Sequence, residues 1–316
     1  MSTKDDIKKS QLDWAVSKGI KLSEIYPYYC RNADCNIYDG LYEKVREQFY
    51  YGSGNELKDK KSKKTGKIEP AKMRALHSSS ALCVNLFQYF IDENGQAKNF
   101  AKELLIACGL INENNDGDVK SIEFEKKFST GISTPNLDVV IKYGTEFENH
   151  LFAFESKFNE PYSSHYEDFN LLKKSYYSDK NKRIWDNVGS LYDALIEIKE
   201  KRVPGKKKNM LIFDYNYLDG AQLIKHILGI ANTLTKNNDE SNVKLIYLWY
   251  DTFDSDGEKH RNEINEFCDF IKQKTDNAKK NVDVIHRTYQ EVIDNLSSRL
   301  SDLHQDYLNY LKERYL

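Results

Sequence analysis

The sequence predicts an α/β fold in which helices flank a mixed β-sheet. Between residues 97 and 251 the patterns run in the order helix, three strands, helix, strand. Within this order, residues 135–162 have the pattern of a hairpin, because two runs of β-forming residues flank a polar turn. The chain has 316 residues, 40% of them hydrophobic, which is enough for a sizeable core.

A helical region precedes this α/β part. Residues 4–18, 38–50 and 76–92 have helical patterns, and the last begins with HSSS, whose serines are suited to helix capping. Seven lysines between Lys58 and Lys72 predict an exposed, mobile loop there. We therefore divide the chain into a helical N-terminal region with a basic loop (1–95), an α/β core (96–286) and a C-terminal helix (287–316).

The core elements follow from local patterns. KNFAKELLIACGL (98–110) predicts a helix ended by Gly109, and IEFEKKF (122–128) alternates like a strand. After the hairpin we expect polar helices near 163–178 and 183–200, and a second basic loop at 201–209. MLIFDYN (210–216) is strand-like, 220–234 is a helix, and VKLIYLWYDTF (243–253) is apolar enough for a central strand. A helix near 257–275 and a short strand at 282–285 complete the core.

The C-terminal segment carries a heptad-like apolar pattern. Its spacing of 4, 3, 4, 3, 4 and 3 residues predicts a single long helix with a narrow apolar seam. The seam could join two copies in a homodimer, or it could pack on its own domain. Its residues are Tyr289, Ile293, Leu296, Leu300, Leu303, Tyr307 and Tyr310.

Composition limits the class of protein. The 47 basic and 49 acidic residues give a formal net charge of −2, so any contact with nucleic acid must depend on local basic patches. Five cysteines, an odd number, do not form a disulfide framework. The N-terminus lacks the apolar centre of a signal peptide, and no run of about 18 apolar residues predicts a membrane span. We expect a cytoplasmic protein without membrane contact.

The hairpin gathers charged residues at one end. With the turn at 145–148, opposed residues have a constant index sum, and side chains two apart share a face. Asp138, Glu155 and Lys157 then form one cluster, while Leu137, Val139 and Ile141 face Phe152 and Phe154 in the core. The expected pairs are Lys142 with Leu151, Val140 with Ala153, Asp138 with Glu155, and Asn136 with Lys157.

Opposed carboxylates at Asp138 and Glu155 need compensation, because like charges facing each other destabilise a strand pair. A shared proton, the ammonium group of Lys157 or a hard divalent cation could each provide it. The alternative is a surface salt-bridge cluster without a function. With a bound divalent cation, Asp138, Glu155 and Lys157 on one face are sufficient for phosphodiester hydrolysis.

At these residues the sequence resembles the PD-(D/E)XK nuclease superfamily, and more closely its bacterial restriction-endonuclease-like branch. The matching segments are Pro135-Asn136-Leu137-Asp138 and Glu155-Ser156-Lys157, the two acids being separated by sixteen residues. Two residues lie between Pro135 and Asp138, where the signature has none. HSSSALCVNLF, IEFE, ESKFNEPY and AQLIKH are similar to the restriction-endonuclease-like branch. The resemblance implies a core of helix, three strands, helix and strand, which is the order predicted above.

The resemblance also implies an activity: a Mg²⁺-dependent endodeoxyribonuclease, with Mn²⁺ as a substitute, that cuts DNA in restriction or defence. Asp138 and Glu155 would hold the metal, and Lys157 would activate the attacking water. Glu125 would be a third acid, with Glu123 and Glu103 as alternatives. A solvated acid at a strand edge is an equally good interpretation of Glu125.

Further residues are candidates for nucleic-acid contact. Gln222 in AQLIKH matches a glutamine that some superfamily members place near the metal water or DNA, while His226 is expected to be a packed histidine. Lys206, Lys207 and Lys208 in the second basic loop are expected to contact the DNA backbone, as are the lysines of the first loop; the alternative role is solubility. A non-catalytic nucleic-acid-binding or interaction module on the same fold is the alternative function.

Overall fold

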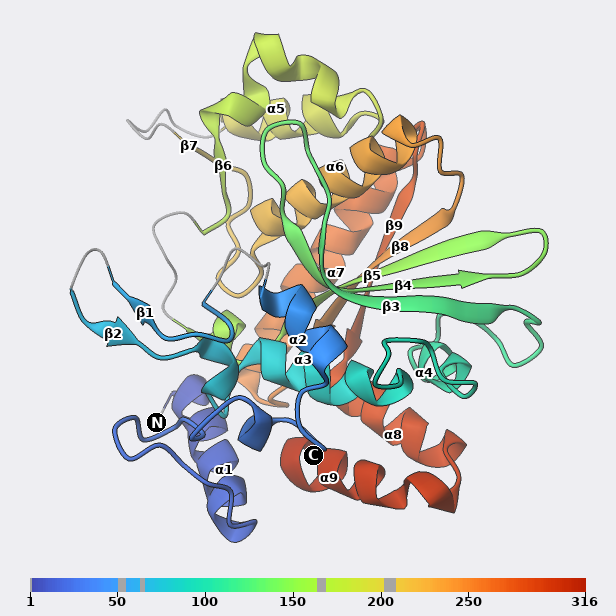
Figure 1. The fold of residues 1–316 in the computed structure, drawn as a ribbon. Helices are drawn as coiled ribbons and strands as arrows, with labels where there is room; N and C mark the ends of the chain where they lie inside the picture. The colour runs from blue at the N-terminus through green and yellow to red at the C-terminus, as the bar shows by residue number, and fades with distance from the viewer. Residues whose placement is uncertain (1, 51–54, 63–65, 164–168, 202–208) are drawn as a thin grey trace.

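A five-stranded mixed sheet forms the centre of the fold (Figure 1). The computed structural model describes residues 2–50, 55–62, 66–163, 169–201 and 209–316. The strand order is β3-β4-β5-β8-β9, with β3, β4 and β5 antiparallel and β8 and β9 parallel to β5. The strands are β3 (Asp118–Lys127), β4 (Asn136–Gly144), β5 (Asn149–Lys157), β8 (Asn242–Trp249) and β9 (Val282–Thr288).

Helices cover both faces of this sheet (Figure 1). Among the described residues they are α1 (Thr3–Ser17), α2 (Glu43–Tyr50), α3 (Ser79–Phe87), α4 (Lys102–Ala107), α5 (Leu191–Lys201), α6 (Gly220–Lys236), α7 (Ser255–Thr275), α8 (Tyr289–Arg299) and α9 (Gln305–Tyr315). Short 3-10 helices span Asp34–Asn36, Lys72–Arg74, Gln88–Phe90, Glu160–Tyr162, Lys174–Tyr177, Asp179–Trp185 and Asp302–His304. The order α4, three strands, α6, β8 confirms the predicted α/β fold class with a helical N-terminal region.

Two hydrophobic clusters fix these layers. On one face, Phe152 and Phe154 of β5 pack with residues of α3, α4, α8 and α9. On the other, Leu151 and Ala153 pack with residues of α6 and α7. The alternation along β5 reflects the two-residue period of a strand, so a strand buried on both faces is apolar almost throughout. The charged residues at the end of β5 interrupt this pattern.

Several predicted segments differ from the structure. The helix expected at 163–178 is absent from the described part of that range, where β6 (Leu171–Lys173) pairs with β7 (Asn209–Leu211). Asn170 has φ +54°, a left-handed conformation that does not continue a right-handed helix, and its side chain donates to the carbonyl of Leu218 at 2.8 Å. The described part of the first basic loop contains a strand pair, in which β1 (Lys60–Lys61) pairs with β2 (Ile68–Glu69).

The prediction of a single long C-terminal helix was also wrong. Leu300 is extended (φ −80°, ψ 140°), so α8 ends at Arg299 and a 3-10 turn precedes α9. Leu303 is 91% exposed, whereas Tyr289, Ile293, Leu296, Leu300 and Tyr307 are buried in the cluster beneath the sheet and Tyr310 packs against it. The seam therefore packs within its own chain. Ser and Asp at the break favour turns and helix starts over helix interiors.

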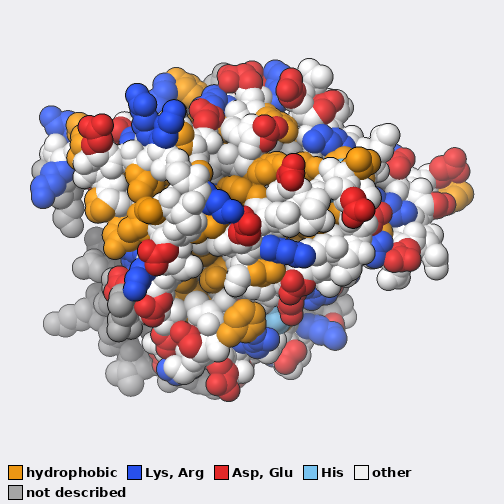
Figure 2. Space-filling model, turned by 90° about the horizontal axis from the view of Figure 1, so that it is seen from below, with side chains coloured by type: hydrophobic (Ala, Val, Ile, Leu, Met, Phe, Trp, Pro, Cys, Tyr) orange, Lys and Arg blue, Asp and Glu red, His pale blue; other side chains and the backbone are white. Residues whose placement is uncertain are grey.

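The surface has no dominant charge on the face viewed from below, where α1 and α9 lie (Figure 2). Hydrophobic, basic and acidic side chains are intermixed there, as the near-neutral composition implies.

Within the described ranges, no helix combines the length and apolarity needed to cross a membrane. Lys18 pairs with Glu313 at 2.6 Å, which links the end of α1 to α9.

We predict that His260 makes the fold sensitive to acid. This α7 residue is fully buried and its Nε2 lies 3.0 Å from the hydroxyl of Tyr247, and burial lowers the pKa of His260 to about 3. Because the unfolded chain takes up this proton below about pH 6.5, stability should fall as pH drops from 6.5 towards 3, by about 1.4 kcal/mol per pH unit. Urea unfolding of wild type and His260→Gln at pH 7, 6 and 5 measures this slope. Equal slopes for the two proteins would contradict the prediction.

Candidate active site

The hairpin register agrees with the sequence as far as Val139. The β4–β5 ladder pairs Lys142 with Leu151 and Val140 with Ala153, and its last pair is Val139 with Phe154. The expected pairs Asp138–Glu155 and Asn136–Lys157 do not form part of the ladder. Leu137 lies in the cluster against α6 and not, as expected, on the face of Val139.

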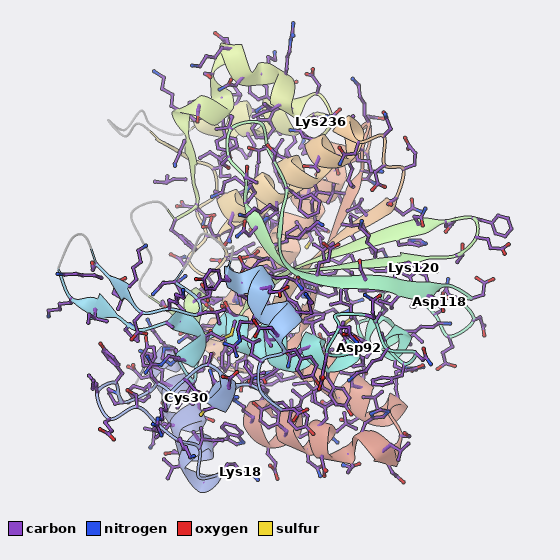
Figure 3. The ribbon with its side chains drawn as sticks, in the orientation of Figure 1. Lys18, Cys30, Asp92, Asp118, Lys120 and Lys236 are labelled. Atoms are coloured by element: carbon purple, nitrogen blue, oxygen red, sulfur yellow. The ribbon has the colours of Figure 1, made fainter. Side chains whose placement is uncertain are left out.

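A local irregularity in β3 lies opposite this change of face. Glu125 has φ +51°, a left-handed conformation that is uncommon outside glycine, and no ladder pair is formed between Phe124–Val139 and Lys126–Leu137. Asn136 donates through Nδ2 to Glu125 Oε2 at 2.7 Å across the break. Asp118 and Lys120 mark the distant start of β3 in Figure 3, and the site lies at the strand's other end. Irregular strands of this kind commonly redirect side chains next to active sites.

Asp138 is directed at β5 just beyond the last pair. Its Oδ2 accepts a hydrogen bond from the backbone N–H of Ser156 at 2.6 Å. Burial, followed by the negative charge of Glu155, raises the pKa of Asp138 well above its ordinary value; Lys157 opposes this shift. The charge of Glu155 therefore acts on Asp138, although the two residues do not form a ladder pair.

Glu155 is buried, at 2% exposure, and fixed by three side chains. Its Oε1 accepts from Lys157 Nζ at 2.6 Å and from Gln222 Nε2 at 2.7 Å. Its Oε2 lies 3.0 Å from His226 Nε2, in an orientation that does not make a hydrogen bond. Burial raises the pKa of Glu155, but Lys157 and His226 together lower it to about 2, so this carboxylate is ionised at neutral pH.

Lys157 is paired with Glu155 and interacts electrostatically with Asp138. Burial disfavours its charged form, yet the carboxylates of Glu155 and Asp138 raise its pKa above the ordinary value. The ammonium group is therefore positive at neutral pH, and its charge favours the ionised form of both acids. The cluster predicted from the hairpin, Asp138 with Glu155 and Lys157, is brought together by the structure.

Helix α6 supplies the second group of side chains. Asp219 caps its start by accepting from the N–H of Gln222 at 3.0 Å, which directs the first turn at the end of β5. Gln222 and His226 are four residues apart, one helical turn, and both contact Glu155. Lys236 marks the opposite end of this helix in Figure 3. His226 was expected to be only a packed histidine; its spacing from Gln222 was the available signal.

The candidates for a third acid lie in different surroundings. Glu103 pairs with Arg299 at 2.8 Å, and Glu123 pairs with Lys126 at 2.5 Å. Glu125 is the candidate whose charge acts on Asp138 and whose own pKa is raised, first by burial and then by neighbours that include Glu56 and Glu155. Of the three, Glu125 is electrostatically part of the site.

Glu56 was missed by sequence reasoning. It is 8% exposed, accepts from Lys72 at 3.0 Å and from the hydroxyl of Ser80 at 2.9 Å, and raises the pKa of Glu125. It lies in a polar, lysine-rich segment whose composition predicts a solvated loop, so no local pattern marks it. Only the packing of this segment on α3 brings it beside the site.

The donor set fits a divalent cation held by two carboxylates. Among the described residues, no group of three or more His, Cys, Asp or Glu side chains is arranged to hold a metal. Glu155 Oε2 is nevertheless a buried oxygen without a hydrogen-bond partner. Mg²⁺ is commonly bound through one or two carboxylates, with water and substrate phosphates completing its coordination. Asp138 and Glu155 supply such a pair.

The lysines of the two basic loops were also candidates for contact with nucleic acid. Lys206, Lys207 and Lys208 lie outside the described residues. In the first loop, Lys58 lies over the ring of Tyr50, with 4.1 Å from Nζ to the ring centroid, and Lys72 is paired with Glu56.

Comparison with known proteins identifies the family of this chain. A family model described as "Restriction Endonuclease associating with ARP" matches residues 21–316. No curated protein and no solved structure matches the chain significantly. The match covers nearly the whole chain and includes every residue of the Asp138, Glu155 and Lys157 cluster. This chain belongs to the family of restriction endonucleases associating with ARP, which confirms the restriction-endonuclease-like resemblance of its sequence.

Proposed function

We propose that the protein is a divalent-metal-dependent endonuclease that hydrolyses phosphodiester bonds of DNA at the cluster of Asp138, Glu155 and Lys157. The observation that carries the proposal is the charge balance of this cluster. Lys157 is paired with Glu155, burial and the charge of Glu155 raise the pKa of Asp138, and Glu155 Oε2 has no hydrogen-bond partner among the described residues. Membership of a restriction endonuclease family supports DNA as the substrate.

The residues have separate roles in this proposal. Asp138 and Glu155 would hold Mg²⁺ or Mn²⁺. A cation held there would lower the pKa of a bound water molecule and withdraw negative charge from the phosphoryl oxygens. Lys157 provides a fixed positive charge beside the scissile phosphate and positions the attacking water.

Gln222 and His226 act on Glu155 and not on the substrate. Gln222 donates to Oε1, the same oxygen that accepts from Lys157, which leaves Oε2 as the oxygen available for a cation. His226 is 1% exposed and limits the orientations of that carboxylate. A ligand held by its neighbours in one orientation loses little freedom when the metal binds.

The experiment that tests the proposal is plasmid cleavage by purified wild-type protein. Modified and unmodified plasmids are incubated with Mg²⁺, with Mn²⁺, with Ca²⁺ and with chelator, and strand breaks are followed on gels. We expect cutting with Mg²⁺ or Mn²⁺, none in chelator and little with Ca²⁺, which is larger and binds with less rigid geometry. Cutting that continues undiminished in chelator would contradict metal dependence.

A protein that binds DNA but never cuts it would instead be a non-catalytic module on a nuclease fold. The same plasmids answer this question if DNA binding is measured by mobility shift in Ca²⁺. Binding without cutting across the whole panel, with Mg²⁺ and Mn²⁺ present, would favour the module over the enzyme.

A further inference from the structure

A pocket opens beside the catalytic cluster at the carboxyl ends of β5 and β8. It has a volume of about 340 Å³, and Lys157 and Gln222 form part of its wall. In sheets with parallel strands, ligands commonly bind at this end of the strands. The pocket is larger than a phosphate group needs and lies in the size range of small-molecule sites, about 300–1,000 Å³.

Aromatic rings form much of the remaining wall. Phe169, Tyr217 and Tyr247 line the pocket, and Pro161 adds further apolar surface. The Tyr217 hydroxyl donates to Asp256 Oδ1 at 2.8 Å, and the Tyr247 hydroxyl is 3.0 Å from His260 Nε2. Because its hydroxyl is already bonded, half-buried Tyr217 offers ring surface to an occupant, whereas Tyr247 is 2% exposed.

The charges of the pocket are balanced. Lys4 from α1 and Lys157 are matched by the carboxylates of Glu160 and Asp219. A pocket built for phosphate would have an excess of positive charge. A neutral, flat ligand with N–H donors fits better, because aromatic rings stack with its faces and carboxylates accept from its edge.

We propose that this pocket receives one unpaired nucleobase of the DNA strand, next to the phosphodiester held at Glu155 and Lys157. The inference rests on the proposed nuclease function, since it takes the adjoining cluster as the phosphate site. Lys157, shared by the pocket and the cluster, lies where base and phosphate of one nucleotide would meet. The substrate would therefore be unpaired at that position, either before binding or by extrusion of the base.

Calorimetric titration of the full-length protein in Ca²⁺ tests the pocket without requiring cleavage. The probes are deoxynucleoside 5′-monophosphates and deoxyribose 5-phosphate, which lacks the base. We expect the nucleotides to bind about tenfold more tightly than the sugar phosphate, the range that stacking on an aromatic side chain gives. Tyr217→Ala and Phe169→Ala should each lose most of this difference, whereas Tyr217→Phe should keep it.

Phe147→Ala is the matched control, because Phe147 is 90% exposed at the tip of the β4–β5 hairpin and should bind nucleotides as wild type does. Equal binding of sugar phosphate and nucleotides, or unchanged binding by both alanine variants, would overturn the assignment of this pocket to a nucleobase. If the pocket fails while the wild type still cuts plasmids, the proposed function stands. If base-dependent binding occurs in a protein that cuts nothing, the nuclease fails and the nucleotide pocket stands.

Discussion

Asp138→Asn and Glu155→Gln should each lower the rate of divalent-dependent DNA cleavage about 1,000-fold or more. Both changes remove a charged oxygen ligand with little change in shape, and the loss of several kcal/mol of transition-state stabilisation corresponds to such a factor. Initial rates with Mg²⁺ and Mn²⁺ measure the effect. Lys157→Ala should lose most of the rate while keeping the stabilisation by Mn²⁺, because it removes no metal ligand.

Thermal unfolding in chelator separates this effect from misfolding. Because the pKa of Asp138 is raised in the folded protein, its ionised form destabilises the fold once the pH exceeds the unfolded value of about 3.8. The penalty grows as the pH rises to the folded pKa, so Asp138→Asn should unfold at a higher temperature than wild type at pH 8. Mn²⁺ should then raise the Tm of wild type but not of this variant.

The matched control is Glu148→Gln, at the turn of the same hairpin and paired only with His150, at 3.2 Å, among described residues. It should cut DNA at the wild-type rate. If Asp138→Asn cut as fast as Glu148→Gln, the site would be assigned to the wrong residues.

Arg314→Met should lower the free energy of unfolding by about 3–5 kcal/mol. Arg314 is 3% exposed and has no carboxylate partner among the described residues; its guanidinium lies 4.4 Å from the ring centroid of Trp14. It donates to Asn36 O at 2.9 Å, to Asn36 Oδ1 at 2.5 Å and to Gln11 Oε1 at 3.0 Å. These buried acceptors would be left without a donor, so the cost exceeds that of an ordinary surface change.

Urea unfolding of wild type and variant measures this cost, and the Tm should fall by on the order of 10 °C. Lys312→Met, on the same helix, is the control and should change stability by no more than about 0.5 kcal/mol. Arg314→Lys should fall between the two, because an ammonium group cannot reproduce the fork of donors. A loss for Arg314→Met no larger than that for Lys312→Met would show that α9 is held by apolar packing alone.

Local patterns in the sequence determined the elements and much of the site. The turn at residues 145–148 and the two-residue period of the strands fixed the hairpin register, which the structure follows to the pair Val139–Phe154. That register predicted the cluster of Asp138, Glu155 and Lys157, because the pairing of the two strands and the two-residue spacing along each strand are short-range properties. The fold class followed from the order of helical and strand-like segments.

Only the tertiary structure decided which distant residues join this cluster. Glu56 and His226 reach the site through the packing of an N-terminal segment and of α6. No local pattern marks Glu56, and the only local signal for His226 is its four-residue spacing from Gln222. The break at Leu300 was equally hidden, because a heptad pattern states which residues are apolar but not whether the backbone continues as a helix. The chemistry of the hairpin follows from its local residues, whereas long-range packing determined its surroundings, since contacts between distant segments depend on the whole folded chain.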